Sequence, residues 1–170
     1  FQYDKSFPET DKVKVLVIGN SFARDWVNVL LASEHVDRLA ISYIEHPFEH
    51  VELQARSAKA DRIYYSEAGV EDVAKLGLPV EKLKVVGTKS FGVSIGRFYI
   101  HGREGYCEQR TDLAPGTALA NVKARTAWGD RYLDLLAPLQ DASGQVPVFT
   151  STCRFISQDA RHLTRAGAQY

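Results

Sequence analysis

A serine near the start of the chain and an aspartate–histidine pair near its end have the residue types of acyl-transfer chemistry. Ser21 follows an apolar run that breaks at Gly19, and Asp159 stands three residues before His162. A histidine can accept the proton of a serine hydroxyl near neutral pH, and a carboxylate can hold the imidazole in the tautomer that this transfer requires. The sequence therefore predicts Ser21 as the nucleophile, His162 as its base and Asp159 as the residue that orients the base.

The elements that must position these residues alternate between strand and helix. Short apolar runs predict strands over 13–18, 39–44, 61–65, 83–87 and 146–150. Helical spacing of apolar residues predicts helices over 23–33 and 70–76, one or two more within 118–139, and a last one near His162. This alternation predicts an α/β fold, a three-layer α/β/α sandwich around a central parallel sheet of about five strands.

The predicted topology brings the two ends of the chain together. Parallel sheets place their sites beyond the carboxyl ends of the strands. Ser21 follows the first predicted strand, and Asp159 and His162 follow the fifth, so we expect all three at one edge of the sheet. Taken alone, Ser21 could be a helix N-cap and His162 a surface or capping residue. Their shared place at the sheet edge favours the catalytic interpretation.

Length and composition indicate one globular domain. The protein has 170 residues, 45% of them hydrophobic, which suits a single core over residues 1–170. Its 21 basic and 21 acidic residues balance, so no charge field favours nucleic acid or an anionic membrane surface. No stretch is long and apolar enough to span a bilayer. The sequence begins with Phe1 and contains no methionine, so we expect a domain excised from a longer protein.

The motifs at the two ends resemble those of the SGNH (GDSL-type) hydrolase superfamily. Gly19-Asn20-Ser21 after an apolar strand is similar to the family's Gly-Asp-Ser block, with Asn20 in place of the aspartate. Asp159 and His162 match the family's last block, Asp-x-x-His. Residues 163–168 read Leu-Thr-Arg-Ala-Gly-Ala, which is similar to the SGNH domains fused to integral-membrane acyltransferases of bacteria.

The resemblance implies an SGNH-like fold and an O-acyltransferase or acyl-esterase that acts on a carbohydrate, with acylation of a bacterial surface polysaccharide as the expected role. It also implies a carbohydrate acceptor as partner and a membrane acyltransferase domain in the full-length protein. The domain would then be periplasmic or otherwise extracytoplasmic, tethered to the inner membrane. Triad chemistry of this kind needs no metal and no organic cofactor. The alternative is a non-catalytic glycan-binding or positioning module that keeps the SGNH fold.

The rest of the oxyanion hole is less evident in the sequence. The family's middle blocks supply a glycine and an asparagine, whereas this protein reads Tyr-Ser-Glu-Ala-Gly over 65–69 and Gly-Thr-Lys-Ser over 87–90. The resemblance carries over the backbone N–H of Ser21 as one donor. Losing a single donor typically lowers the rate by about 10²–10³-fold, and the missing asparagine supports the binding-module alternative. The further candidates for oxyanion or substrate contacts are Ser66, Gly87, Lys89 and Ser90.

The segment 89–116 is rich in glycine and aromatic residues and is expected to be a long loop or lid. Its aromatic side chains either stack on sugar rings or pack together as a small core. These aromatic residues are Phe91, Phe98, Tyr99 and Tyr106. Its basic residues could face an anionic glycan or simply lie on the surface, and they are Lys89, Arg97 and Arg103.

Cysteines and the remaining histidines leave further alternatives open. Cys107 and Cys153 either form one disulfide, in an oxidising compartment, or remain separate thiols. His46 and His50 could hold zinc if they shared a helix face, but Pro47 lies between them and a solvated loop is favoured. His101 is an alternative base, although no aspartate stands at a suitable spacing from it.

Overall fold

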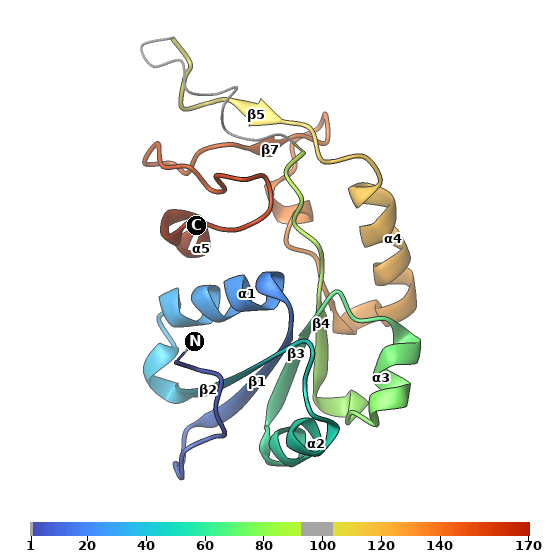
Figure 1. Ribbon diagram of the computed structural model, residues 1–170. Coiled ribbons are helices and arrows are strands. Elements are labelled where there is room, and N and C mark those ends of the chain that lie inside the picture. Colours follow the sequence, from blue (N-terminus) through green and yellow to red (C-terminus); the bar gives the residue numbers. More distant parts are fainter. Residues whose placement is uncertain (1, 93–103) are drawn as a thin grey trace.

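The computed structural model describes residues 2–92 and 104–170. Within them a central sheet of five parallel strands has the order β2-β1-β3-β4-β6 (Figure 1). The strands are β1 (Val13–Gly19), β2 (Leu39–Glu45), β3 (Arg62–Ser66), β4 (Leu83–Val86) and β6 (Tyr132–Leu133). The predicted α/β fold is therefore confirmed. The predictions made for Arg97, Phe98, Tyr99, His101 and Arg103 lie outside the described residues.

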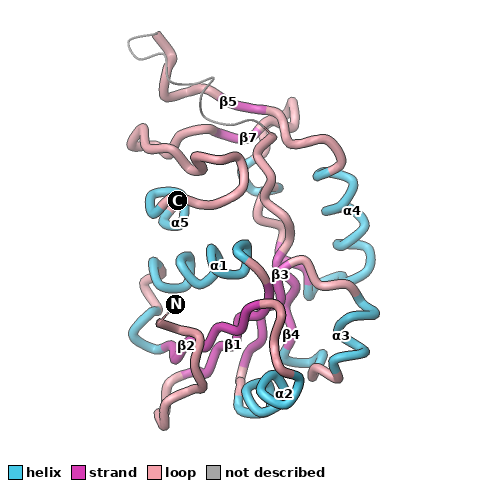
Figure 2. The backbone as a smooth tube through the Cα atoms, in the orientation of Figure 1, coloured by secondary structure: helices cyan, strands magenta, loops and turns pink. Residues whose placement is uncertain are grey.

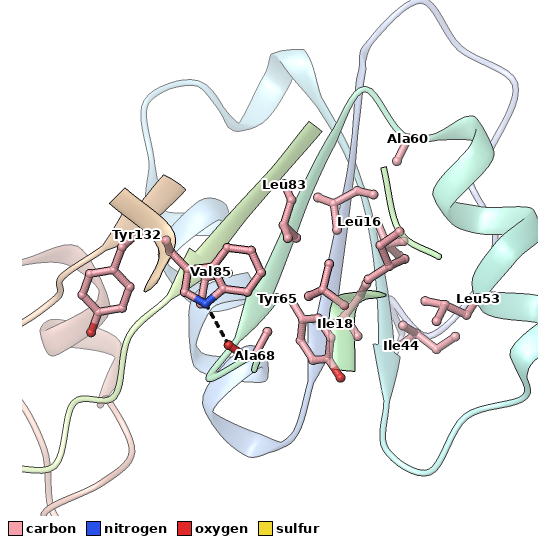
Figure 3. Packing of buried hydrophobic residues seen from close by; sticks show 14 of the residues in the cluster. Leu16, Ile18, Ile44, Leu53, Ala60, Tyr65, Ala68, Leu83, Val85 and Tyr132 are labelled. Atoms are coloured by element: carbon pink, nitrogen blue, oxygen red, sulfur yellow. Dashed lines mark hydrogen bonds between the residues drawn. The ribbon is translucent and has the colours of Figure 1, made fainter. Parts of the chain in front are cut away.

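Strand β1 is the centre of the fold because both of its faces are covered. Leu16 and Ile18 point into one core cluster, whereas Val15 and Val17 belong to another. None of these four side chains is more than 2% exposed. Figure 3 shows Leu16 and Ile18 beside Ile44 and other apolar residues of the first cluster. A strand buried on both faces explains the unbroken apolar run in the sequence.

Helices cover both faces of the sheet. Helix α1 (Ser21–Ala32) packs through Ala23 and Val27 against one face. The opposite cluster includes Leu53 of α2 (His50–Lys59), Val73 of α3 (Val70–Leu76) and Trp128 of α4 (Thr117–Trp128). The indole N–H of Trp128 donates to the Ala68 carbonyl at 3.0 Å (Figure 3). None of the helices in residues 2–92 and 104–170 has both the length and the apolar character to cross a bilayer.

The prediction of 146–150 as a strand of the central sheet was wrong. Val146–Pro147 forms β7, which pairs antiparallel with β5 (Arg110–Thr111) in a separate small sheet. The fifth central strand is instead β6, which lies within the segment predicted as helix and pairs with β4. Gly129, with φ of 54°, ends α4 there. A two-residue strand is too short for an alternation pattern, so the sequence carried no signal for it.

The part of the protein that follows α4 is mostly loop and leads to α5 (Arg165–Gln169), which packs against α1 (Figure 2). A disulfide joins Cys153, in this part of the protein, to Cys107, which precedes α4, with Cα atoms 5.1 Å apart. Aromatic rings pack nearby, because Phe149 lies 4.8 Å from Tyr106 and 4.5 Å from Phe155 between ring centroids. The disulfide therefore links the predicted lid segment to the segment that leads to the aspartate–histidine block.

Phe91 is also part of a core cluster. It is 5% exposed and packs with Leu136, Val146 and Ile156. Of the aromatic residues proposed for sugar stacking, Phe91 and Tyr106 thus follow the small-core interpretation.

Reduction of the disulfide should destabilise the domain without changing its fold. Closing a loop between residues 46 positions apart is worth about 4 kcal/mol in the chain-entropy model. For a domain of this size that corresponds to a fall in melting temperature of about 10 °C. Thermal unfolding of the wild type with and without a thiol reductant measures this shift. The control is the double variant Cys107→Ser/Cys153→Ser, whose melting temperature should be insensitive to reductant. An equally insensitive wild type would contradict the bond.

Candidate active site

Ser21 begins α1 at the point where strand β1 ends against β3. Gly19 has φ of 140°, and a Cβ there would lie 3.0 Å from the Cβ of Ala23 and 3.3 Å from that of Ser66. Only glycine accepts this backbone angle and this closeness without strain. The glycine therefore lets the backbone pass from the buried strand into the helix with Ser21 at the carboxyl edge of the sheet.

The helix cap is Asn20, not Ser21. The Asn20 side chain accepts the Phe22 N–H at 2.9 Å, which is the hydrogen bond of an N-cap. Ser21 consequently occupies the first helical position, where its own N–H has no intrahelical acceptor. The structural role considered for Ser21 thus belongs to its neighbour, and the Ser21 hydroxyl is left for another partner.

That partner is His162. The Ser21 Oγ lies 2.8 Å from His162 Nε2, and His162 Nδ1 lies 2.5 Å from Asp159 Oδ2. A neutral imidazole that donates through Nδ1 leaves Nε2 as the acceptor for the serine hydroxyl. The second carboxylate oxygen, Oδ1, accepts the backbone N–H groups of Arg161 and His162 at 2.9 and 2.7 Å. The three residues predicted from the sequence therefore stand in the order that proton transfer requires.

The loop that carries Asp159 and His162 is closed at its base. Ser157 and Leu163 form an antiparallel bridge, and the Thr164 N–H donates to the Ile156 carbonyl at 2.9 Å. Thr164 also caps α5 by accepting the Gly167 N–H at 3.0 Å. A Cβ at Gly167 would lie 2.1 Å from the Ile156 oxygen, so only glycine permits α5 to pack this closely on the loop base.

Asp159 is held as a carboxylate. Burial by itself would raise its pKa, but hydrogen bonds from the His162 ring and from the backbone N–H groups of His162 and Arg161 outweigh burial. The pKa of Asp159 therefore lies well below its usual range. An ionised Asp159 suits a residue that must fix the imidazole tautomer and stabilise the imidazolium.

Lys89 was predicted as an oxyanion or substrate contact, but the structure turns it inward. Its side chain is 2% exposed and its Nζ lies 2.6 Å from Asp25 Oδ2, on a side chain that is 7% exposed. The ammonium also lies 4.0 Å from the centroid of the Phe22 ring. Burial lowers the pKa of Lys89, and the Asp25 carboxylate opposes that shift.

Sequence reasoning did not single out Asp25. The available signal was its spacing of four residues from Ser21, which places both on one face of α1. A single acidic residue in an amphipathic helix is more typical of a solvated position, so this signal was weak.

The other predicted oxyanion residues differ in position. Ser66 ends β3 next to Gly19, is 6% exposed, and its Oγ has no hydrogen-bond partner among the described residues. The Gly87 N–H donates to the Leu133 carbonyl at 2.9 Å. Ser90 is half-buried. Of these residues, the structure brings Ser66 to the Ser21 edge of the sheet with an uncommitted hydroxyl.

A hollow of about 540 Å³ opens beside the residues that precede Ser21. Gly19, Asn20 and Ser66 line one side of it, and His46 and Tyr65 are also in its wall. His46 Nε2 lies 2.9 Å from the Tyr65 hydroxyl. In the part of the protein that the structure describes, no three histidine, cysteine or acidic residues gather as metal ligands.

Comparisons with protein-family models, with curated proteins and with solved structures found no match to this sequence or fold.

The low pKa of Asp159 predicts a specific loss of stability in acid. Because the folded state favours the carboxylate, Asp159 stabilises the fold above its unfolded pKa of about 3.9, and this contribution is lost as pH falls through the lower folded value. The effect is small, since 55% of the side chain is exposed. Urea unfolding should therefore show a gap between wild type and Asp159→Asn that closes between about pH 5 and pH 2. A gap independent of pH would contradict the assignment.

Proposed function

We propose that this domain is a serine-dependent O-acyltransferase or acyl-esterase of the SGNH type that acts on a carbohydrate. The observation that carries the proposal is the continuous hydrogen-bonded series from Ser21 through His162 to Asp159. Ser21 serves as nucleophile, His162 as general base and then general acid, and Asp159 as the orienting carboxylate. The resemblance of the two end motifs to the SGNH superfamily supports the same assignment.

The reaction follows from these three positions. Ser21 Oγ attacks the acyl carbonyl while its proton passes to His162 Nε2, and the imidazolium is stabilised by Asp159. The tetrahedral intermediate expels the donor alcohol, which takes the proton from His162, and an acyl-serine remains. An acceptor hydroxyl, from a sugar or from water, then attacks the acyl-serine and gives its proton to Nε2. Release of the new ester or free acid restores the Ser21 hydroxyl.

Two groups near Ser21 can stabilise the oxyanion. The Ser21 N–H stands at the positive end of α1, where the helix dipole also favours negative charge. We assign Ser66 as the second donor, because its hydroxyl has no partner among the described residues and the residue borders the hollow beside Gly19 and Asn20. The Gly87 N–H, which donates to Leu133, is not assigned this role.

The hollow suits a polyhydroxylated ligand. Its wall combines the rings of Phe48 and Tyr65 with the carboxylates of Glu67 and Asp72 and the imidazole of His46. Ring faces pack against the apolar faces of sugars, and the polar groups offer hydrogen bonds to hydroxyls. We therefore place the acceptor sugar in this hollow.

An extracytoplasmic location belongs to the same proposal. The Cys107–Cys153 bond is of a kind that persists in oxidising compartments, including the bacterial periplasm. A membrane acyltransferase domain would then deliver the acyl group, as the fused-domain resemblance implies. A surface polysaccharide is the acceptor that fits this setting.

A glycan-binding module without catalysis is the second candidate. It is favoured by the small number of oxyanion donors, since no asparagine takes the place of the family's middle-block residue. The assembled triad argues against it, because binding alone requires no base within 2.8 Å of a serine hydroxyl. Activity of the Ser21 variant separates the two candidates.

Ser21→Ala should abolish hydrolysis of a small acetyl ester. Removal of a triad nucleophile lowers the rate by about 10⁴–10⁶-fold, whereas the fold should be unaffected because Asn20 caps the helix. Steady-state kinetics measures the loss, and circular dichroism checks the fold. The matched control is Ser33→Ala at the other end of α1, which should retain wild-type activity. Activity of Ser21→Ala within a few-fold of the wild type would remove Ser21 from the mechanism.

The rate should fall in acid through a single protonation. A protonated imidazole cannot accept the Ser21 proton, and histidine side chains generally titrate between about pH 5 and 8. Asp159 adds no second step in this range, since its pKa is lowered. A pH profile of kcat/KM with the acetyl ester tests this. A flat profile over that range, or one with two protonations on the acid side, would be inconsistent with the assignment.

A further inference from the structure

We propose that Asp25 and Lys89 are positioning residues, which hold His162 in line with Ser21 by binding the backbone on both sides of it. The inference rests on the proposed function, because it concerns the base of that reaction. Neither residue touches the Ser21 hydroxyl or the His162 ring by a hydrogen bond in the described structure. Their part is to fix the distance over which the proton moves.

The contacts of the pair straddle His162. Lys89 Nζ donates to the carbonyl of Arg161 at 2.8 Å, one residue before the histidine. Asp25 Oδ2 accepts the N–H of Leu163 at 2.9 Å, one residue after it. The same Oδ2 lies 2.6 Å from Lys89 Nζ, so the two contacts share one ion pair. The peptide groups on both sides of His162 are therefore hydrogen-bonded to the same buried ion pair.

One partner of the ion pair, Asp25, lies on the helix that carries the nucleophile, whereas Lys89 follows β4. Asp25 is four residues after Ser21, so the carboxylate and the hydroxyl lie on the same face of α1, one turn apart. Phe22 adds to the contact, because its ring lies 4.0 Å from Lys89 Nζ and 5.7 Å from the His162 ring. Any movement of the His162 loop relative to Ser21 must therefore disturb the hydrogen bonds that the loop makes with Asp25 and Lys89.

Stability alone does not explain two charges at this place. A buried ion pair loses hydration on both partners, and well-packed apolar residues of similar size are often as stabilising or more so. Apolar residues, however, could not accept the Leu163 N–H or donate to the Arg161 carbonyl. A further hydrogen bond, from the Phe91 N–H to the Ala160 carbonyl at 2.8 Å, holds the loop independently of the ion pair. The ion pair is thus suited to set the final position of His162.

The test compares Lys89→Met and Asp25→Leu with the double variant that carries both substitutions. Each single variant leaves one buried charge without its partner and should lower both melting temperature and activity. The double variant restores an apolar interior, so its melting temperature should return toward that of the wild type. Its kcat on the acetyl ester should nevertheless stay about 10²-fold below wild type, because His162 is no longer held in register. KM should change little, since the pair does not line the hollow beside Ser21.

Milder and distant substitutions serve as controls. Asp25→Asn keeps an acceptor oxygen for the Leu163 N–H and should retain more activity than Asp25→Leu. Arg56→Met removes another buried cation, which is 3% exposed and donates to the Tyr43 carbonyl at 2.7 Å. That variant should lose stability but keep its kcat when assayed well below its melting temperature. A loss of kcat confined to the Asp25 and Lys89 variants supports a positioning role.

The outcomes are distinguishable. Recovery of kcat together with melting temperature in the double variant would overturn the inference, as the pair would then be only structural. Full kcat in the single variants, with an inactive Ser21→Ala, would overturn it and leave the proposed function standing. An active Ser21→Ala would overturn both. A stable double variant with low kcat and unchanged KM is the result that we expect.

Discussion

One hydrogen bond joins residues 141 positions apart, from the Ser21 hydroxyl to His162 Nε2, and the proposed chemistry depends on its length. Its two ends belong to different parts of the fold. Ser21 is fixed by the buried strand β1 and by the Asn20 cap of α1. His162 lies on a loop that does not directly follow any strand of the central sheet. The structure must therefore hold the His162 loop in a fixed position against α1.

Several local constraints meet this need. The Ser157–Leu163 bridge closes the loop, and the close packing of Gly167 on Ile156 seats α5 against it. The Asp25–Lys89 pair then binds the loop backbone to α1. Charges buried in this way are costly unless each is paired and hydrogen-bonded, as these are. Directional polar contacts can fix a register that apolar packing alone leaves loose.

The sequence predicted the fold class, most strand positions and the proximity of Ser21, His162 and Asp159, because each has a local signal. Gly19 before Ser21 marks a strand that ends in a sharp turn, and the spacing of Asp159 and His162 fits one short loop. The fifth strand was placed wrongly, since β6 has two residues and its pairing depends on β4. The two ends of the protein meet as predicted, but the segment before Asp159 passes through the small sheet of β5 and β7 and not through the central sheet.

Other parts of the site depend on tertiary contacts that no local pattern encodes. Lys89 has the sequence context of a solvent-facing cation, and only its partner Asp25 explains why it is buried. Asp25 in turn has the sequence context of an exposed helix residue, and only its distant partners, Lys89 and the N–H of Leu163, which donates to its carboxylate, account for its burial. The free hydroxyl of Ser66 likewise becomes visible only when β1 and β3 are paired. Residues whose partners are distant in sequence are the ones that sequence reasoning missed or assigned otherwise.

The most direct test of the proposed triad is to locate the nucleophile chemically. A serine-directed fluorophosphonate reacts only with an activated hydroxyl, and mass spectrometry of a digest identifies the modified residue. The triad predicts one adduct, on Ser21, formed in the wild type and strongly slowed in His162→Ala, since the base is then absent. An adduct on another serine, no adduct at all, or equal labelling of wild type and His162→Ala would contradict it.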